Sequence, residues 1–185
     1  MDPITRANLD NLHSKDLETQ NKAYIALLNT THAPVDWAYE AWDELLADLT
    51  DKDNHVRSIS AQVLCNLAKS DPEKRMLKDF DALLAVTKDE RFVTARHCLQ
   101  ALWQVGAAGE AQKKRLMDGL SERFRECITE KNGALIRHDI QVGLRNLYDQ
   151  DKDDSVKETA LALIETEEDL KYRKKYAGVW KGREK

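Results

Sequence analysis

The stretch "DKDNHVRSISAQVLCNLA", residues 51–68, opens with an acidic turn and continues into a segment whose apolar residues recur every three or four positions. Its apolar stripe consists of Val56, Ile59, Val63, Leu64 and Leu67. This spacing is typical of an α-helix with one buried face, and the polar turn supplies residues that cap helix N-termini. The stretch therefore predicts a helix that begins just after the turn and packs one face against a neighbour.

Two further stretches share this arrangement of an acidic turn, a valine and a helical apolar pattern. They are "KDERFVTARHCLQALWQVG", residues 88–106, and "DKDDSVKETALALIE", residues 151–165. A helix with a leucine-rich stripe precedes each stretch, so the unit is about 40 residues of two antiparallel helices, which is the period of helical solenoids. The string Arg-His-x-x-Gln also occurs twice, starting at Arg96 and at Arg137, and we interpret it as part of the same structural repeat.

These units resemble HEAT repeats, and residues 51–68 are the best single match, with Asp51 in the turn and Val56-Arg57 opening the second helix. The resemblance covers most of the chain. It implies an all-α fold, a right-handed α-α superhelix (solenoid) of four to five HEAT-like helical hairpins. The count stays open because the helix that carries Arg137 fits either as the second helix of one unit or as the first helix of the next.

The units depart from the HEAT pattern at several positions. Ser60 stands where a small alanine is usual, and Thr94 and Lys157 stand where the family favours arginine. The resemblance also implies that Arg57 pairs with a turn acid such as Asp51 or Asp89.

Three helix starts carry recognisable caps. Asp2 precedes Pro3, and Asp71 precedes Pro72, so each aspartate is expected to cap a helix that begins at the proline. Ser155 and Glu158 have the spacing of a capping box, in which each side chain reaches the other residue's backbone N–H.

Composition supports one helical domain over residues 1–185. Of the 185 residues, 42% are apolar, and there are only 3 prolines and 7 glycines, which favours helix. No apolar run has the length of a bilayer span, and "MDPITRANLDNL" at the N-terminus lacks the regions of a leader, so we expect a soluble, unprocessed chain without a membrane partner. The three cysteines, Cys65, Cys98 and Cys127, lie in apolar segments, which suits buried thiols in the cytoplasm.

Charge is unevenly distributed along the chain. Residues 171–185 hold seven Lys/Arg and one Glu, a net charge of +6, so a chain total of −4 leaves −10 on residues 1–170. Tyr172, Tyr176 and Val179 have helical spacing, and we interpret residues 167–185 as a basic C-terminal capping helix and tail. The alternative is that this tail binds acidic surfaces or nucleic acid.

No motif in the chain predicts catalysis, a metal or a cofactor. The five histidines lack metal-site spacing, and the His-Glu dipeptides of HEAT-like di-iron hydroxylases do not occur. His97-Cys98 and His138-Asp139 are interpreted as surface or capping residues. Glycine-rich phosphate loops, G-x-S-x-G and paired carboxylates in apolar settings are absent from the sequence, and buried thiols are poor nucleophiles.

The expected function is that of a non-catalytic scaffold that binds a protein partner on its concave surface, which the second helices would line. The residues expected to point outward there and to bind the partner are Arg96, Gln100, Trp103, Arg137, Gln141, Arg145 and Tyr148. Arginines and aromatics are common at interface hot spots. In the structural alternative, Trp103 packs between repeats and the arginines pair with acids, and for Arg96 and Arg137 both interpretations stay open.

The second functional hypothesis is a nucleic-acid-binding protein of the HEAT-like DNA glycosylase type, which cradles DNA on a basic concave surface. The charge of −10 on residues 1–170 argues against it, and the catalytic residues of that family have no counterpart that can be placed in this sequence. A bilin-lyase-like HEAT protein that acts on a tetrapyrrole is a third hypothesis. The sequence predicts no oligomeric state.

Overall fold

The structure is a computed structural model that describes residues 1–181, and over that range it contains helices and no strand. The prediction of an all-helical chain is therefore confirmed. The α-helices are α1 (Pro3–Asn11), α2 (Leu17–Thr30), α3 (Ala38–Asp48), α4 (Asn54–Leu67), α5 (Met76–Val86), α6 (Phe92–Ala101), α7 (Trp103–Gly106), α8 (Glu110–Glu126), α9 (Gly133–Asp151), α10 (Asp154–Glu165) and α11 (Leu170–Val179). Short 3-10 turns follow α4 and α8.

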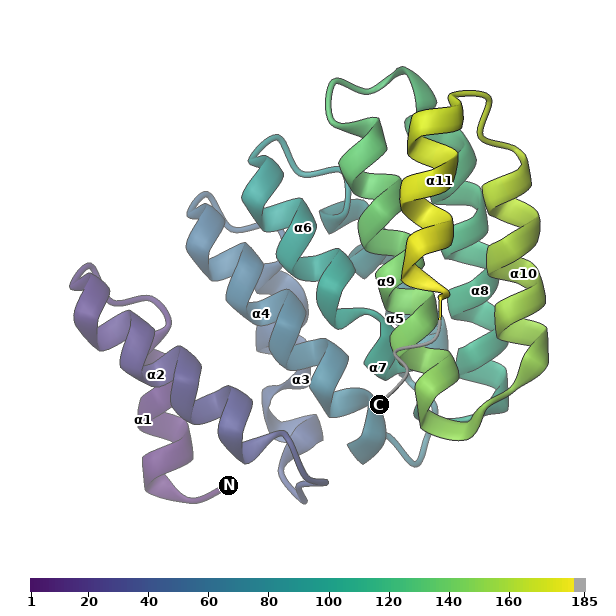
Figure 1. The fold of residues 1–185 in the computed structure, drawn as a ribbon. Coiled ribbons are helices and arrows are strands. Elements are labelled where there is room, and N and C mark those ends of the chain that lie inside the picture. The colour runs from purple at the N-terminus through teal and green to yellow at the C-terminus, as the bar shows by residue number, and fades with distance from the viewer. Residues whose placement is uncertain (182–185) are drawn as a thin grey trace.

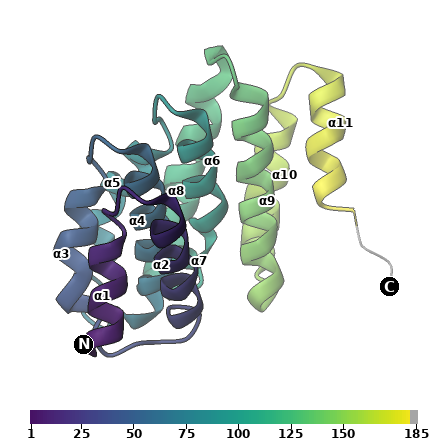
Figure 2. The ribbon, with the colours of Figure 1, turned by 90° about the vertical axis from the view of Figure 1, so that its left-hand side faces the viewer.

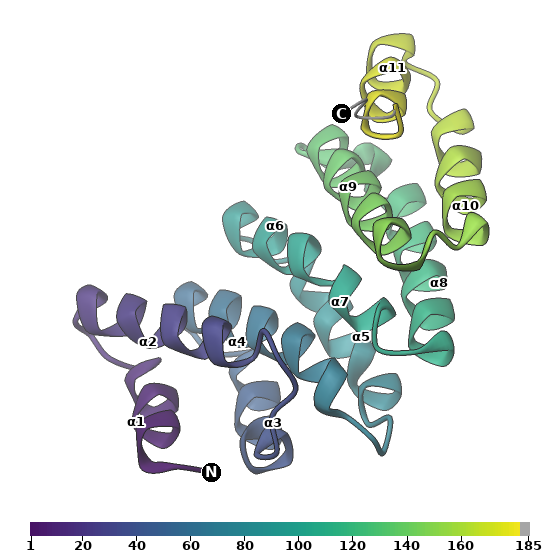
Figure 3. The ribbon, with the colours of Figure 1, turned by 60° about the horizontal axis from the view of Figure 1, so that its bottom comes forward.

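The helices pack in consecutive pairs that form two layers (Figure 1). The pairs are α1 with α2, α3 with α4, α5 with α6, α8 with α9, and α10 with α11, and the short α7 follows α6 and packs on α8 and α9. Helices α2, α4, α6, α9 and α11 lie side by side and are called the inner layer here, because Figure 3 shows them on the hollow side of a curved row. Helices α1, α3, α5, α8 and α10 form the outer layer. Figure 2 shows α1 and α11 at opposite ends of this row.

The packing of α9 and α10 shows which layer each helix belongs to. Helix α9 packs between α6 and α11, so it is the second helix of its pair, whereas α10 packs on α8 in the outer layer. Residues 151–165 thus form the first helix of a pair, whereas residues 51–68 form a second helix. The prediction that the two stretches are equivalent copies is therefore wrong. That prediction relied on an acidic turn followed by a valine. Acidic turn residues cap many helix starts, so the pattern does not distinguish first from second helices.

The structure confirms one predicted cap and corrects two. The Asp2 carboxylate accepts hydrogen bonds from the N–H groups of Ile4 and Thr5, with Pro3 in the first turn. Helix α5 begins at Met76 rather than at Pro72, although the Asp71 carboxylate still accepts from the N–H of Met76 at 2.7 Å.

Helix α10 is capped by Asp153 and not by the predicted capping box. The Asp153 carboxylate accepts from both the backbone N–H and the hydroxyl of Ser155, at 3.0 and 2.7 Å. These bonds and the ammonium of Lys113 lower the pKa of Asp153 to about 2. Because Asp153 lies before Ser155 and takes its N–H, the helix starts before Ser155 could act as the cap.

The core is one continuous apolar cluster that runs between the layers. Cys65, Cys98 and Cys127 are all buried and free, as predicted, and burial raises the pKa of each thiol. Gly119 brings α8 close to α5, since a Cβ at this position would lie 2.8 Å from a methyl group of Leu84. Among residues 1–181, no helix combines the length and apolar character that a bilayer crossing requires.

Candidate functional site

Three arginines of the inner layer each reach an acid that belongs to the next helix pair or leads into it. Arg57 on α4 donates to Asp89 at 2.6 Å, and Arg96 on α6 donates to both oxygens of Asp139 at 2.6 and 3.0 Å. Arg137 on α9 donates to Glu167 in the loop before α11, at 2.8 Å. The expected pairing of Arg57 with a turn acid is confirmed. These arginines therefore hold neighbouring pairs in register.

Arg137 and Gln141 do not point outward, which corrects the expectation for both residues. The Arg137 side chain is only 5% exposed, its Nε donates to the carbonyl of Phe124 at 2.8 Å, and its guanidinium lies over the Phe124 ring. Gln141 is fully buried: its amide nitrogen donates to the carbonyl of Ala160, and its oxygen accepts from the indole of Trp180. Both residues therefore join α9 to neighbouring segments and are inaccessible to a partner.

The first copy of the repeated string is more open. Arg96 has a 36% exposed side chain in spite of its ion pair, and Gln100 is exposed on α6. Trp103 is partly buried and packs against the core cluster, as the structural alternative expected. Arg96 and Gln100 thus remain candidates for partner contact.

Arg145 and Tyr148 lie where α9 meets the end of α11, and both are partly buried. The Arg145 guanidinium pairs with Asp149 at 2.8 Å and lies 5.8 Å from the ring centres of both Tyr148 and Trp180. Tyr148 and Trp180 contact each other edge to face. These residues pack α11 onto α9 and offer a partner only their outer edges.

The sequence analysis missed a group of basic side chains on the inner layer, which we call the inner cationic group: Arg96, His97, His138 and Lys175. Burial and then the ammonium of Lys175 lower the pKa of His138, with Asp139 opposing and Arg96 adding to the decrease. Burial and Arg96 likewise lower the pKa of His97. The members of this group come from α6, α9 and α11, which are far apart in the sequence. Only the packing of these helices brings them together.

A hollow on the inner layer lies beside this group, between α2, α4 and α6. Leu17, Tyr24 and Ile59 give it apolar walls, while Ser58 and His97 form a hydrogen bond of 3.0 Å at one side. This pair lacks the buried third group that orients the base of a catalytic triad, because within residues 1–181 no acid contacts His97. The apolar walls suit the hollow to binding an apolar side chain.

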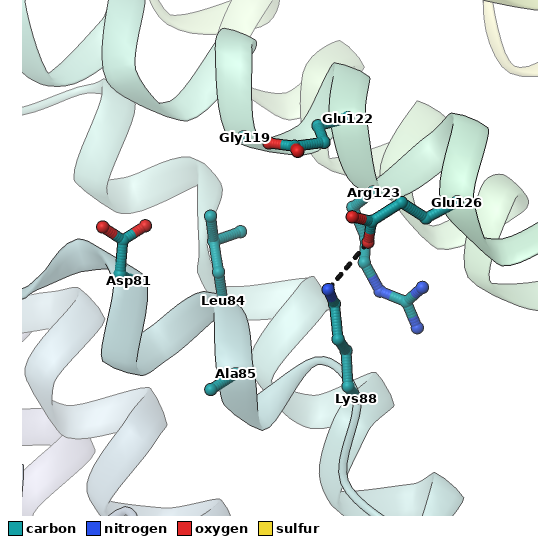
Figure 4. A pocket seen from close by; sticks show the side chains of 8 residues that line it. All are labelled: Asp81, Leu84, Ala85, Lys88, Gly119, Glu122, Arg123 and Glu126. Carbon is teal, nitrogen blue, oxygen red and sulfur yellow. Dashed lines mark ion pairs between the residues drawn. The ribbon is translucent and has the colours of Figure 1, made fainter.

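On the opposite side, a shallow pocket lies between α5 and α8 of the outer layer (Figure 4). Its rim carries Asp81, Lys88, Glu122 and Glu126, and Lys88 pairs with Glu126 at 2.7 Å. Arg123 turns inward to Glu130 and Thr87. Lys88 is paired within the pocket, and Asp81 and Arg123 pair with Arg115 and Glu130 beside it, which leaves this pocket a weaker candidate than the inner layer.

Comparison with known proteins supports the fold alone. No protein family model matches the chain, and no curated protein matches it. Two crystal structures of engineered proteins are similar over 97% of this chain, with TM-scores of 0.52 and 0.54 and sequence identities of 20% and 18%. The match covers 78% and 79% of those chains. At this level of identity the likeness shows a shared helical architecture and says nothing about function.

Proposed function

We propose that the chain is a right-handed superhelix of HEAT-like repeats that acts as a non-catalytic scaffold and holds a protein partner on its concave, inner-layer surface. Support comes from the five consecutive helix pairs, the curved row and the recurrent arginine pairs between neighbouring units. Repeat stacks of this kind present extended concave surfaces to macromolecules. A cytoplasmic location is part of the proposal and rests on the three free, buried cysteines.

The inner cationic group indicates that the protein partner is acidic. On the inner layer, Arg96 and the exposed Lys175 supply positive charge beside His97 and His138, whose lowered pKa values favour the neutral imidazole. Complementary charge guides encounter and selects partners. The adjoining hollow would take an apolar side chain, so the expected partner presents an acidic segment with an apolar anchor.

Site-specific photo-crosslinking tests this surface. A photo-reactive amino acid at Gln100 on the inner layer, with a matched control at Glu122 on the outer layer, is introduced into cells that express the protein. We expect one defined set of acidic proteins to crosslink at position 100 and not at position 122, and Lys175→Glu should reduce the yield. Equal crosslinking from the two positions, or a yield unchanged by Lys175→Glu, would contradict the proposal.

The basic residues of α11 favour nucleic-acid binding as a second candidate function. Lys171, Lys174 and Lys175 are exposed there, as is Lys181 just after the helix; Arg183 and Lys185 lie outside the described residues. Binding that depends on phosphate contacts weakens steeply with salt. We expect double-stranded DNA binding to be weak and abolished by salt, and salt-resistant, lesion-selective binding that survives deletion of residues 171–185 would favour the glycosylase-like alternative.

A further inference from the structure

Three potential metal ligands meet where the first helix pair contacts the second. His13 follows α1, Asp48 ends α3, and Asp51 lies in the turn before α4. One ligand atom from each residue lies within 4.8 Å of the others, and Nε2 of His13 is 3.3 Å from Oδ2 of Asp48. The cluster therefore combines an imidazole nitrogen from the first helix pair with two carboxylates from the second.

The carboxylate of Asp48 lacks a permanent positive partner. Asp48 is 8% exposed and accepts one hydrogen bond, from the Ser60 hydroxyl at 3.1 Å. Within residues 1–181, no lysine or arginine pairs with it, and His13 can compensate its charge only when protonated. A bound cation would stabilise a buried carboxylate with so few partners.

We propose that His13, Asp48 and Asp51 bind a divalent cation of the zinc class. Zinc takes nitrogen and carboxylate oxygen ligands at about 2.0–2.2 Å in a tetrahedron, which places neighbouring ligand atoms about 3.4 Å apart. The 3.3 Å separation of the His13 and Asp48 atoms matches this spacing. Calcium and magnesium prefer larger sets of oxygen ligands, so the imidazole favours zinc.

The remaining geometry is compatible with an open coordination position. The His13 side chain is 40% exposed, which leaves room for a water ligand. Asp51 uses one oxygen to accept the N–H of Asp53 at 2.7 Å, and the other oxygen can approach the ion by side-chain rotation. Such an ion would fasten the α1–α2 pair to the α3–α4 turn, and this role is independent of any partner on the inner layer.

Zinc titration of the full chain by calorimetry tests the site. We expect one zinc per chain for the wild type and for the control His55→Ala, which removes another exposed histidine near a helix start. His13→Ala and Asp51→Asn should each weaken binding by at least about tenfold, because even residues that only support metal ligands have effects of that size. Cobalt substituted at the site should give the visible absorption of a tetrahedral complex in the wild type but not in His13→Ala.

Thermal unfolding gives a second measurement. Zinc at about 100 times its Kd should raise the melting temperature by roughly 5–10 °C in the wild type and in His55→Ala, with no rise in the two ligand variants. Circular dichroism verifies that each variant folds, and Asp51→Asn alters only a turn side chain. Absence of saturable 1:1 binding, or zinc affinity unchanged in both His13→Ala and Asp51→Asn, would overturn the proposal.

Discussion

Helices α6 and α9 carry the same string, Arg-His-x-x-Gln, in the same layer, yet the two copies have different surroundings. Arg96 is 36% exposed and Gln100 is exposed on α6, whereas on α9 the Arg137 side chain is 5% exposed and Gln141 is fully buried. The difference arises because α10, α11 and the loop between them enclose the second copy. Identical residues therefore support an accessible surface in one unit and a closed interface in the next.

Replacing each of the two arginines should give the largest difference in stability between the two copies. Arg137→Ala leaves the buried carboxylate of Glu167 without its partner and should lower the free energy of unfolding by about 3–5 kcal/mol. Arg96→Ala also strands a buried carboxylate, since the Asp139 side chain is 5% exposed, but it should cost less, about 2–3 kcal/mol, because water can enter at the partly exposed position of the arginine. Urea unfolding of both variants measures the difference, and an equal loss would show that exposure does not distinguish the copies.

The variant Arg137→Lys tests whether the charge of Arg137 is sufficient or its guanidinium geometry is needed. A lysine keeps the charge but cannot donate to both Glu167 and the Phe124 carbonyl with the planar geometry of a guanidinium. We expect its stability to fall between those of the wild type and Arg137→Ala.

Replacing each of the two glutamines should give a smaller difference in stability than replacing the arginines. Gln141→Ala removes the partner of the Trp180 indole and of the Ala160 carbonyl, and the loss of such buried bonds costs about 1–3 kcal/mol. Gln100→Ala changes an exposed side chain and should stay within about 0.5 kcal/mol of the wild type. Thermal melts of this matched pair provide the measurement, and a destabilised Gln100→Ala would place Gln100 in an interface that the fold does not show.

The smallest expected effect is a dependence of stability on pH in the inner cationic group. The folded-state pKa of His138 and of His97 is lowered, so the unfolded chain binds protons more readily and their contribution to stability is lost as pH falls below about 6.5. For His138, Lys175 and Arg96 disfavour the charged form and Asp139 favours it.

Lys175→Gln should weaken the pH dependence that comes from His138. Melting temperatures of the wild type, Lys175→Gln and His138→Gln are compared between about pH 5.5 and 7.5, a window around the ordinary histidine pKa. Lys157→Gln, on the outer-layer helix α10, is the control. A slope that is the same in all four proteins would show that the inner cationic group does not act on His138.

Local patterns were sufficient to predict most helices, because apolar spacing and caps act over a few residues. The stripe from Val56 to Leu67 became α4, and Asp2 caps α1 as expected. Prediction failed at two helix starts: a nearby aspartate, Asp153, caps α10 in place of Ser155, and α5 begins at Met76 rather than at Pro72, with Asp71 accepting the Met76 N–H. Local sequence offered several donors and acceptors there, and only the folded turn selects among them.

The candidate site was predicted only in part. The outward placement of Gln100 followed from its position on the helix, but the burial of Gln141 did not, since it depends on Trp180, which lies 39 positions along the chain. Lys175 was assigned to a basic tail, and its proximity to His138 follows from the packing of α11 on α9. The His13, Asp48 and Asp51 cluster has no sequence motif, because its members come from the loop after α1 and from the end of α3 with the turn that follows it.

The sequence by itself determined that this chain forms paired helices with buried thiols, a charge imbalance and a recurrent arginine near the start of the second helices. These properties depend on the 3.6-residue helical period and on residue chemistry, which are local. Only the tertiary structure decided that α9 belongs to the inner layer, that α10 belongs to the outer layer, and which copy of the repeated string stays accessible. Such choices depend on contacts between residues 30 to 43 positions apart, where the packing of neighbouring helices determines burial and charge pairing.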